Sequence, residues 1–376
     1  MPERPPATIG IDASRAGTTH LTGTERYSRR VIEGILALHE PERLRLYVNG
    51  DRPLALDDGA RACQRLIPFP RLWTHLRLSA ELARHPVNAL FVPAHVVPPI
   101  HPRATVVTVH DLGYLHEPGA HTPSARRYLD WSTRWSARAA RLLIAISRAT
   151  RDDLIRYYGV PDGKIRVVPH GVDERFGPMD PAAAAAVAPL GVRPPYILFV
   201  GTLQPRKNLA RLIRAFDRLA GERPELTLVL AGRRGWLAEQ IDAALARSPH
   251  RDRILLLGHA PDDALPSLYA GASALALPSL SEGFGLPVLE AMACGTPALV
   301  SDRGALPEVG GEAALVVDPL DEEAIARGLA RLLEPTERAR RSETGRQWAA
   351  TFTWARTAEH SLEVIREAMS MGGQPS

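Results

Sequence analysis

Cysteine and lysine are scarce in this sequence. Its 376 residues include only two cysteines, Cys63 and Cys294, and only two lysines, Lys164 and Lys207, although lysine and arginine together number 46. Two cysteines cannot build a disulfide framework or a four-thiolate metal site, and their low number fits a reducing cytoplasm. Because arginine replaces lysine almost everywhere else, the two remaining lysines attract attention.

Long apolar runs, a secretion signal and a marked charge excess are also missing. No stretch approaches the roughly 20 apolar residues of a membrane-spanning helix, and the first residues lack the basic start and apolar run of a signal peptide. Apolar residues make up 45% and charged residues 23% of the sequence, as in ordinary globular proteins, and the net charge is +4. Because no signal peptide is recognised, we predict a cytoplasmic protein. The basic excess is diffuse, so we expect no binding to nucleic acid.

Motifs that define several other protein classes are absent. No Gly-X-Gly-X-X-Gly follows a predicted strand, which argues against a dinucleotide-dependent dehydrogenase. The 13 histidines show no metal-ligand spacing. We therefore expect no cofactor and no resident metal ion.

Short apolar runs alternate with helical patterns along the sequence, which predicts parallel sheets covered by helices. Because 376 residues exceed what one core usually fills, we expect an α/β protein of two doubly wound, Rossmann-like domains. The predicted strands cover residues 8–14, 44–50, 89–94, 104–111, 141–147 and 165–173, then 195–202, 226–232, 253–259, 274–279, 296–301 and 313–318. The predicted organisation is a first domain at residues 1–176, a Pro- and Ala-rich linker at 177–195, a second domain at 196–354, and a C-terminal helix at 355–376 that packs back on the first domain.

The most specific motif is EGFGLPVLE, in which Glu282 and Glu290 flank two glycines and the start of a helix. Gly283 and Gly285 let the backbone approach a ligand, and the helix that begins at Leu286 offers unpaired N–H groups to an anion such as pyrophosphate. The two carboxylates can accept hydrogen bonds from hydroxyls of one extended ligand. This motif therefore predicts a site for sugar and ribose hydroxyls beside a diphosphate.

Arg206 and Lys207 form a second candidate element. They lie in a loop that follows a predicted strand and opens a helix, where a phosphate gains both side-chain charge and the helix dipole. Each charge-assisted hydrogen bond there is expected to contribute about 1.5 to 3 kcal/mol.

Together these segments resemble the retaining glycosyltransferases of the GT-B fold, in particular family 4 and its bacterial mannosyltransferase-like members that build surface polysaccharide. The segment from Glu282 to Glu290 is similar to the family's E-X7-E signature, GTLQPRKNL to its phosphate-binding loop, and VHDLGYLHEP to its histidine-bearing acceptor-domain loop. The resemblance extends over nearly the whole chain. It implies two Rossmann-like domains facing each other across a cleft, with the acceptor on the first and the nucleotide-sugar donor on the second.

The resemblance also implies roles for individual residues. The candidate catalytic residues are His110 against the transferred sugar, Glu282 on the sugar hydroxyls, and Arg206 with Lys207 on the donor diphosphate, while Glu290 meets the nucleotide ribose. Many relatives carry an arginine where this chain has Thr202, so Arg206 is expected to hold more of the phosphate charge. The donor-binding candidates besides Glu290 are Gly23, Thr24, Gly201, Thr202, Gly258, His259, Gly283, Phe284, Gly285 and Leu286.

Members of this family transfer sugars with retention of configuration, and the leaving diphosphate helps to deprotonate the acceptor. Positioned cations then stabilise the charge on the β-phosphate, and the loss of one such donor costs on the order of 100- to 1000-fold in rate. The sequence contains no Asp-X-Asp motif of the kind that holds a metal ion in transferases of the other common fold. Arg206 and Lys207 are therefore expected to take the place of the metal.

The acceptor is expected to be a glycan or a lipid-linked molecule bound by loops of the first domain, with Trp73, His75 and Asp111 as candidate contacts. A helical pattern further along mixes tryptophan with arginine, and two interpretations stay open. Either its tryptophans face the core and its arginines face water, or the helix contacts an anionic membrane surface and makes the protein peripheral at the inner face of the cell membrane. The residues concerned are Arg127, Trp131, Arg134, Trp135 and Arg138.

We expect the transfer of a hexose, and the resemblance favours mannose from GDP-mannose in surface polysaccharide biosynthesis. The segment around His259 does not distinguish guanine from uracil, so a UDP-sugar donor stays open. A nucleotide-sugar epimerase on the same fold and a non-catalytic nucleotide-binding protein stay open as well. The E-X7-E motif favours transfer over epimerisation.

Overall fold

The chain folds into two compact α/β units. The computed structural model describes residues 6–371 except 18–22, 39, 58, 60, 95, 118–121 and 180–184. The first unit combines Met1–Leu112, Thr122–Gly171 and Thr353–Ser376, and the second combines Gly113–His121 and Val172–Phe352. The chain thus enters the main part of the second unit after Gly171 and leaves it after Phe352.

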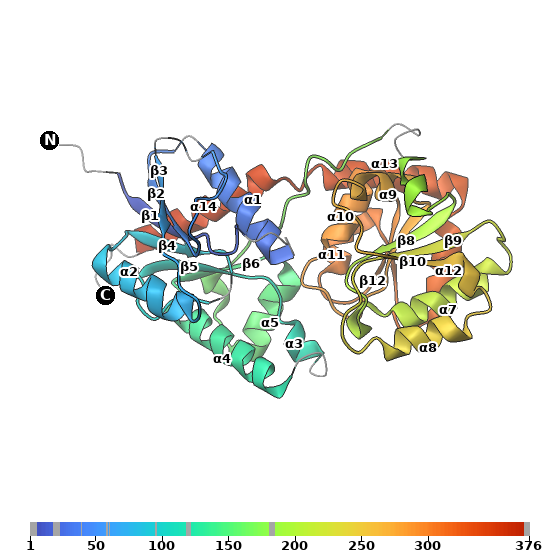
Figure 1. Ribbon diagram of the computed structural model, residues 1–376, viewed down its shortest axis with the longest axis horizontal. Coiled ribbons are helices and arrows are strands. Elements are labelled where there is room, and N and C mark those ends of the chain that lie inside the picture. Colours follow the sequence, from blue (N-terminus) through green and yellow to red (C-terminus); the bar gives the residue numbers. More distant parts are fainter. Residues whose placement is uncertain are drawn as a thin grey trace. The chain divides into compact units, whose positions relative to one another are not determined.

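A parallel sheet of seven strands forms the centre of the first unit. Its strands are β1 (Thr8–Asp12), β2 (Arg43–Val48), β3 (Ala62–Leu66), β4 (Ala89–Val92), β5 (Ala104–Val109), β6 (Leu142–Ala145) and β7 (Ile165–Val167). Their order in the sheet is β3-β2-β1-β4-β5-β6-β7, so the order reverses between β1 and β4. Figure 1 labels β1 to β6. All residues of β4, β5 and β6 are buried, as expected for a parallel sheet covered on both faces. The apolar runs predict every strand except β3, because β3 is a polar, largely exposed edge strand.

Helices connect these strands and cover both faces of the sheet. The helices of the first unit are α1 (Gly23–Ala37), the π-helix η1 (Trp73–Leu78), α2 (Ser79–Arg84), α4 (Pro123–Ala139), α5 (Arg148–Tyr158), the 3-10 turn η3 (Asp162–Lys164) and α14 (Trp354–Ser370). The short helix α3 (Gly113–His116) groups with the second unit.

The C-terminal helix α14 returns to the first unit and packs along α1, as Figure 1 shows. Gly34 permits this close approach, because a Cβ atom added to it would lie 2.5 Å from the Cβ of Ala358. Ile365 is fully buried in the core of this unit. Arg366 fixes the end of the helix, since its Nε donates to Glu42 at 2.7 Å. The last helix is therefore an integral part of the first unit.

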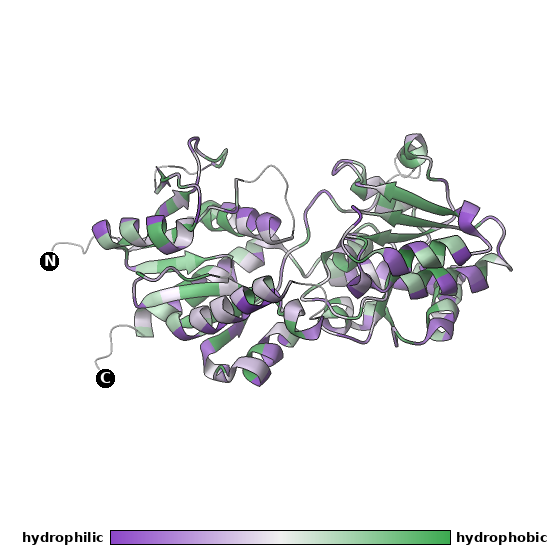
Figure 2. Ribbon diagram, turned by 60° about the horizontal axis from the view of Figure 1, so that its bottom comes forward, coloured by the Kyte–Doolittle hydropathy of each residue, from purple (hydrophilic) through white to green (hydrophobic). Residues whose placement is uncertain are grey.

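The second unit repeats the architecture with six parallel strands, all of them predicted. These are β8 (Tyr196–Val200), β9 (Thr227–Ala231), β10 (Ile254–Gly258), β11 (Ala274–Leu277), β12 (Ala298–Ser301) and β13 (Leu315–Val317), in the order β10-β9-β8-β11-β12-β13. Figure 2 shows the apolar strands and the mixed apolar and polar helices that cover them. The α/β class and the two doubly wound domains predicted from the sequence are confirmed.

The helical segments of the second unit are η4 (Ala185–Leu190), η5 (Pro205–Lys207), α7 (Leu209–Ala220), α8 (Glu239–Arg247), η6 (Arg251–Arg253), α9 (Leu265–Gly271), α10 (Leu286–Ala293), α11 (Leu306–Gly310), η7 (Gly311–Ala313), α12 (Glu322–Leu332) and α13 (Pro335–Ala349). Among the described residues, no helix combines the length and the apolar character that crossing a membrane requires.

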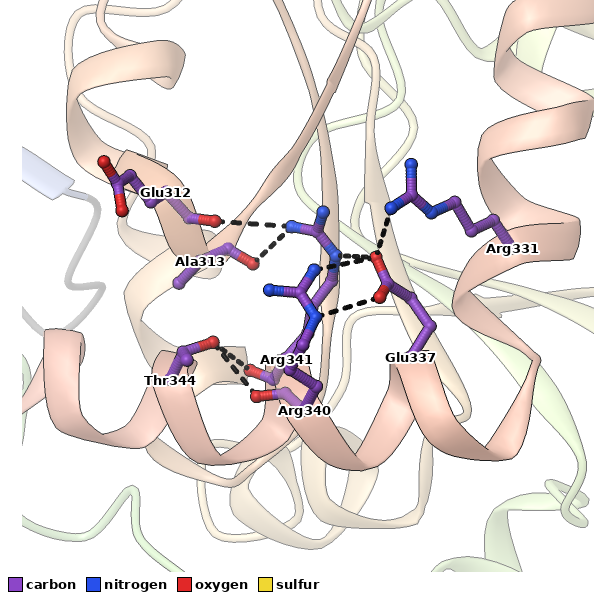
Figure 3. A network of polar contacts seen from close by, with 7 residues as sticks. All are labelled: Glu312, Ala313, Arg331, Glu337, Arg340, Arg341 and Thr344. Carbon is purple, nitrogen blue, oxygen red and sulfur yellow. Dashed lines mark hydrogen bonds and ion pairs between the residues drawn. The ribbon is translucent and has the colours of Figure 1, made fainter.

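A carboxylate surrounded by three arginines joins α12 to α13 (Figure 3). Glu337 accepts from the Nε of Arg341 at 2.7 Å, and its Oε1 lies 3.0 Å from Arg340 and 3.1 Å from Arg331. Arg341 is itself buried and donates to the backbone carbonyl of Ala313 at 3.0 Å. Hydrogen bonds from Arg340 and Arg341 lower the pKa of Glu337 from 4.5 to about 2.

We expect Glu337→Gln to destabilise the protein by about 1 kcal/mol at neutral pH, because the neutral amide loses its charged hydrogen bonds. Since folding lowers the pKa of Glu337, its contribution is complete above pH 4.5 and disappears as the pH falls toward about 2. Urea unfolding of both proteins over this range measures the effect. The difference between them should shrink as the pH falls, and a difference independent of pH would contradict the assignment.

Candidate active site

The predicted donor residues gather at the carboxyl edge of the second sheet, where β8 and β11 end and the strand order reverses. Glu282 is buried and meets both predicted cations. Lys207 Nζ lies 2.5 Å from its Oε1, and Arg206 NH1 lies 3.3 Å from its Oε2. We call these three residues the Glu282 cluster. Open sheets of this topology bind their ligands at such a position.

The Glu282 cluster keeps one net positive charge. Burial of the Glu282 carboxyl acts to raise its pKa, but Lys207 and Arg206 outweigh this effect and hold the pKa below its ordinary value. Glu282 is therefore a carboxylate, and two cations face one anion. Such a cluster can accept hydrogen bonds from hydroxyls and still attract phosphate oxygens.

Two loops hold the cluster in place. Asn208 adopts a left-handed conformation with φ of 59° and donates its side-chain N–H groups to the carbonyls of Pro278 at 3.0 Å and Pro319 at 2.6 Å. The N–H of Leu280 donates to the carbonyl of Arg206 at 2.8 Å, which joins the Arg206 loop to the Glu282 loop. The cations are thus positioned by backbone hydrogen bonds as well as by their ion pairs.

Glycines let neighbouring loops come close to these groups. A Cβ atom on Gly232 would lie 1.9 Å from the carbonyl oxygen of Gly201, and one on Gly201 would lie 3.6 Å from Cε of Lys207. Thr202 packs its methyl group toward Gly235, where an added Cβ would lie 2.9 Å from it. At the end of β8, Gly201 therefore has no side chain between its backbone and Lys207.

The E-X7-E segment turns from the β11 loop into α10 at Gly285, whose φ of 105° favours glycine. A Cβ atom there would also lie 2.6 Å from Leu306. Phe284 is buried, with its ring 6.4 Å from that of Phe352, while Gly283 and Leu286 are half-buried. This turn directs the chain from Glu282 into the helix that carries the second glutamate.

That second glutamate, Glu290, is buried on α10 and hydrogen-bonded to Tyr269. The hydroxyl of Tyr269 donates to Glu290 Oε2 at 2.6 Å, and the carbonyl of Tyr269 accepts from the hydroxyl of Thr296 at 2.5 Å. Tyr269 is fully buried on α9, so it fixes the orientation of the carboxylate. The sequence does not indicate this contact, because nothing marks one buried tyrosine among several.

The base-binding candidates lie at the carboxyl end of β10, on the same edge of the sheet. Gly258 ends β10 with φ of 70°, and its carbonyl accepts from the N–H of Gly232 at 2.6 Å. His259, directly after it, is exposed. The structure thus brings the predicted donor residues of the second unit to one edge of its sheet.

In the first unit, His110 follows β5 and is buried in an aromatic cluster. Its Nε2 lies 2.8 Å from the carbonyl oxygen of Pro93, and its ring meets the edge of Tyr27 at 4.8 Å. Tyr27 stacks on His170, also at 4.8 Å, and its hydroxyl lies 3.1 Å from that of Thr108. Burial, with a smaller effect of His110, lowers the pKa of His170 well below 6.5, so His170 is neutral.

Gly23 and Thr24 begin α1, at the same carboxyl edge of the first sheet as His110 and Asp111. A Cβ atom on Gly23 would meet no described residue within 4 Å. Asp111 is half-buried beside His110.

The two aromatic acceptor candidates, Trp73 and His75, have different surroundings. Trp73 is buried, and its Nε1 donates to the carbonyl of Ile67 at 2.7 Å. His75 is half-buried and stacks against Trp131 with ring centroids 6.1 Å apart. Trp73 therefore supports its loop from below, whereas His75 belongs to a surface.

Comparison with known proteins agrees with these observations. The model "Glycosyltransferase Family 4" matches residues 22–176, and "Glycosyl transferases group 1" matches residues 185–348. The O-antigen chain mannosyltransferase B of Escherichia coli is 30% identical over 370 residues, which cover 92% of this chain and 96% of that protein. The chain belongs to the family 4 glycosyltransferases.

Other relatives and structural neighbours extend the comparison. A D-inositol 3-phosphate glycosyltransferase of Rhodococcus jostii is 33% identical over 286 residues, covering 72% of this chain and 62% of that protein. Sucrose-phosphate synthase from Thermosynechococcus elongatus superposes with a TM-score of 0.76 at 21% identity, over 97% of this chain and all of that one. HepE of Anabaena, in complex with UDP-glucose, gives 0.72 at 18% identity over 97% of this chain and 99% of that one. This family 4 glycosyltransferase therefore has the GT-B fold.

Proposed function

We propose that this family 4 glycosyltransferase moves mannose from GDP-mannose to a glycan or lipid-linked acceptor in surface polysaccharide synthesis, with retention of configuration and without a metal ion. The Glu282 cluster carries the proposal, because it sets two protein cations beside one carboxylate at the ligand-binding edge of the sheet. The relatives named as mannosyltransferases, from Escherichia coli and Mycolicibacterium hassiacum, support mannose as the sugar.

The proposed mechanism is electrostatic. Departure of a nucleoside diphosphate places negative charge on its β-phosphate, which Lys207 and Arg206 stabilise from fixed positions. Glu282, kept as a carboxylate, accepts hydrogen bonds from hydroxyls of the sugar and orients it. The bond between the anomeric carbon and the β-phosphate oxygen breaks, the acceptor oxygen bonds to the same carbon on the same face, and the leaving phosphate oxygen takes the proton of the acceptor hydroxyl. The protein supplies position and charge.

Calorimetric binding of GDP, UDP, GDP-mannose and UDP-glucose in the presence of EDTA tests the donor. We expect guanine nucleotides to bind without metal, and the anomeric configuration of the product, measured by NMR, to match that of the donor. Selective binding of uracil nucleotides would mean that the donor is a UDP-sugar and not GDP-mannose. A change of the donor sugar without any transfer would favour an epimerase, and absence of binding to all four would overturn the donor site.

Tyr269→Phe is expected to weaken binding of GDP roughly fivefold, because Glu290 loses the hydrogen bond that orients it toward the ribose. The same variant should change binding of 2′,3′-dideoxy-GDP little, since that ligand lacks the hydroxyls that Glu290 contacts. Tyr196→Phe is the matched control: Tyr196 is equally buried, but its hydroxyl donates to the carbonyl of Leu268. Equal losses for GDP and its dideoxy analogue would show that Tyr269 has only a structural role.

A further inference from the structure

Large apolar side chains gather on one surface of the first unit. Leu72, Leu76, Tyr128 and Trp131 are each between 47% and 60% exposed. We call these four residues the apolar patch. Monomeric proteins rarely leave apolar side chains clustered in water unless the cluster has a binding role.

The apolar patch joins two segments that are far apart in the sequence. The ring of His75, in η1, lies 6.1 Å from that of Trp131 and 6.5 Å from that of Tyr128, both in α4. Tyr128 and Trp131 are one helical turn apart, with ring centroids at 6.1 Å. The N–H of Leu76 donates to the carbonyl of Leu72 at 2.9 Å, so the two exposed leucines belong to the same turn.

Two tryptophans with hydrogen-bonded indole groups lie next to this surface. The buried Trp73 donates its Nε1 to the carbonyl of Ile67 at 2.7 Å, and the half-buried Trp135 donates to the carbonyl of Val97 at 2.8 Å. Each lies four residues or fewer from an exposed neighbour, Leu72 or Trp131. Both segments are therefore anchored while their other side chains face water.

The charges around the apolar patch are basic. Arg71 and Arg127 are exposed, and residues 66–80 and 122–129 contain no aspartate or glutamate. The next acidic residue on α4, Asp130, pairs with Arg134 at 2.9 Å and accepts from the hydroxyl of Tyr158 at 3.0 Å. An apolar surface with aromatic residues and a basic border matches an anionic lipid surface in both chemistry and charge.

We propose that the apolar patch docks this glycosyltransferase on an anionic bilayer. The inference deepens the proposed function and rests on it for the lipid-linked acceptor. The segment before η1 leaves the sheet at the end of β3, and His110 follows the end of β5, so both start from the carboxyl edge of the same parallel sheet. Docking there would bring the membrane to the edge on which the predicted acceptor residues lie.

Co-sedimentation with phosphatidylglycerol–phosphatidylcholine vesicles tests the apolar contribution. The protein should bind these vesicles and fail to bind phosphatidylcholine alone, and Leu76→Glu with Trp131→Ala should weaken binding at least roughly tenfold. Leu320→Glu is the matched control, because Leu320 in the second unit is 53% exposed against 54% for Leu76. Equal binding by wild type and the patch variant would overturn the proposal.

A second pair of variants separates local charge from net charge. Arg71→Gln with Arg127→Gln should weaken vesicle binding about 25-fold at low salt, whereas Arg218→Gln with Arg247→Gln, which removes the same charge from exposed sites of the second unit, should have little effect. Equal losses of vesicle binding in both pairs would mean that only the net charge of the protein matters, and would contradict docking through the apolar patch.

Two further measurements keep this proposal distinct from the proposed function. Donor binding by calorimetry and transfer to a water-soluble acceptor should be unchanged in all patch variants, so loss of vesicle binding with normal donor binding concerns docking alone. Sedimentation of the protein without lipid tests whether a second copy of the chain covers the apolar patch instead. A dimer that Leu76→Glu dissociates would assign the apolar patch to a second copy and overturn the membrane assignment.

Discussion

Lys207→Ala is expected to lower kcat/KM for sugar transfer by about 100- to 1000-fold. Lys207 lies 2.5 Å from Glu282 Oε1 and beside Gly201, which has no side chain, whereas Arg206 contacts the other carboxylate oxygen, so the charge of Lys207 occupies a position of its own. Alanine removes a cation that stabilises the leaving diphosphate and leaves the buried Glu282 carboxylate with Arg206 as its cationic partner in the cluster. Steady-state kinetics in EDTA, with calorimetric binding of GDP, measures both losses.

Lys164 provides the matched control, since it is the other lysine of the sequence. Its Nζ donates to the carbonyls of Ala137 at 2.7 Å and Arg138 at 3.2 Å, at the end of α4. Lys164→Ala should therefore cost some stability and leave kcat/KM unchanged. Lys207→Arg should recover only part of the activity, because a planar guanidinium cannot place its charge at the position of Nζ. A loss below about tenfold in Lys207→Ala would remove this lysine from the catalytic machinery.

The sequence could predict the donor side of the site because its residues are local to strand ends. Glu282 and Lys207 each lie in the loop that follows an apolar run, and parallel strands bring their carboxyl ends to one edge. The structure adds the contacts that depend on distant segments. Tyr269 reaches Glu290 across 21 residues, and the stacking of Tyr27 on His170 joins positions 143 apart; no periodicity in either segment signals such a pair.

The residues of the apolar patch also depend on contacts between distant segments, which the sequence alone does not predict. The spacing of Trp131 and Trp135 on one helix leaves open which of them faces the core, and the structure answers that Trp135 is anchored while Trp131 is exposed. The other half of the apolar patch, Leu72 and Leu76, comes from the π-helix after β3 and the residue that precedes it, a segment that the sequence does not predict as helical. Likewise β3 escapes prediction, because an edge strand needs few apolar residues.

Gly34→Ala is expected to destabilise the protein by about 1 to 3 kcal/mol, although alanine is the better helix former. The new methyl group would lie 2.5 Å from the Cβ of Ala358 and 3.3 Å from the carbonyl oxygen of Trp354, so α14 must move away from α1. This displacement would loosen the core around Leu362 and Ile365. The midpoint of urea unfolding measures the loss.

Exchanging the methyl group between the two helices gives the decisive control. Gly34→Ala combined with Ala358→Gly restores the space at the contact, so the double variant should be more stable than expected from the sum of the two single changes. Gly221→Ala, at the end of α7, adds a methyl group that meets none of the residues described by the structure within 4 Å and should have little effect. Strictly additive effects of the two changes would mean that α1 and α14 do not pack through Gly34 and Ala358. Non-additivity would instead show that the last helix of the chain is held in the first unit by a contact that only glycine permits.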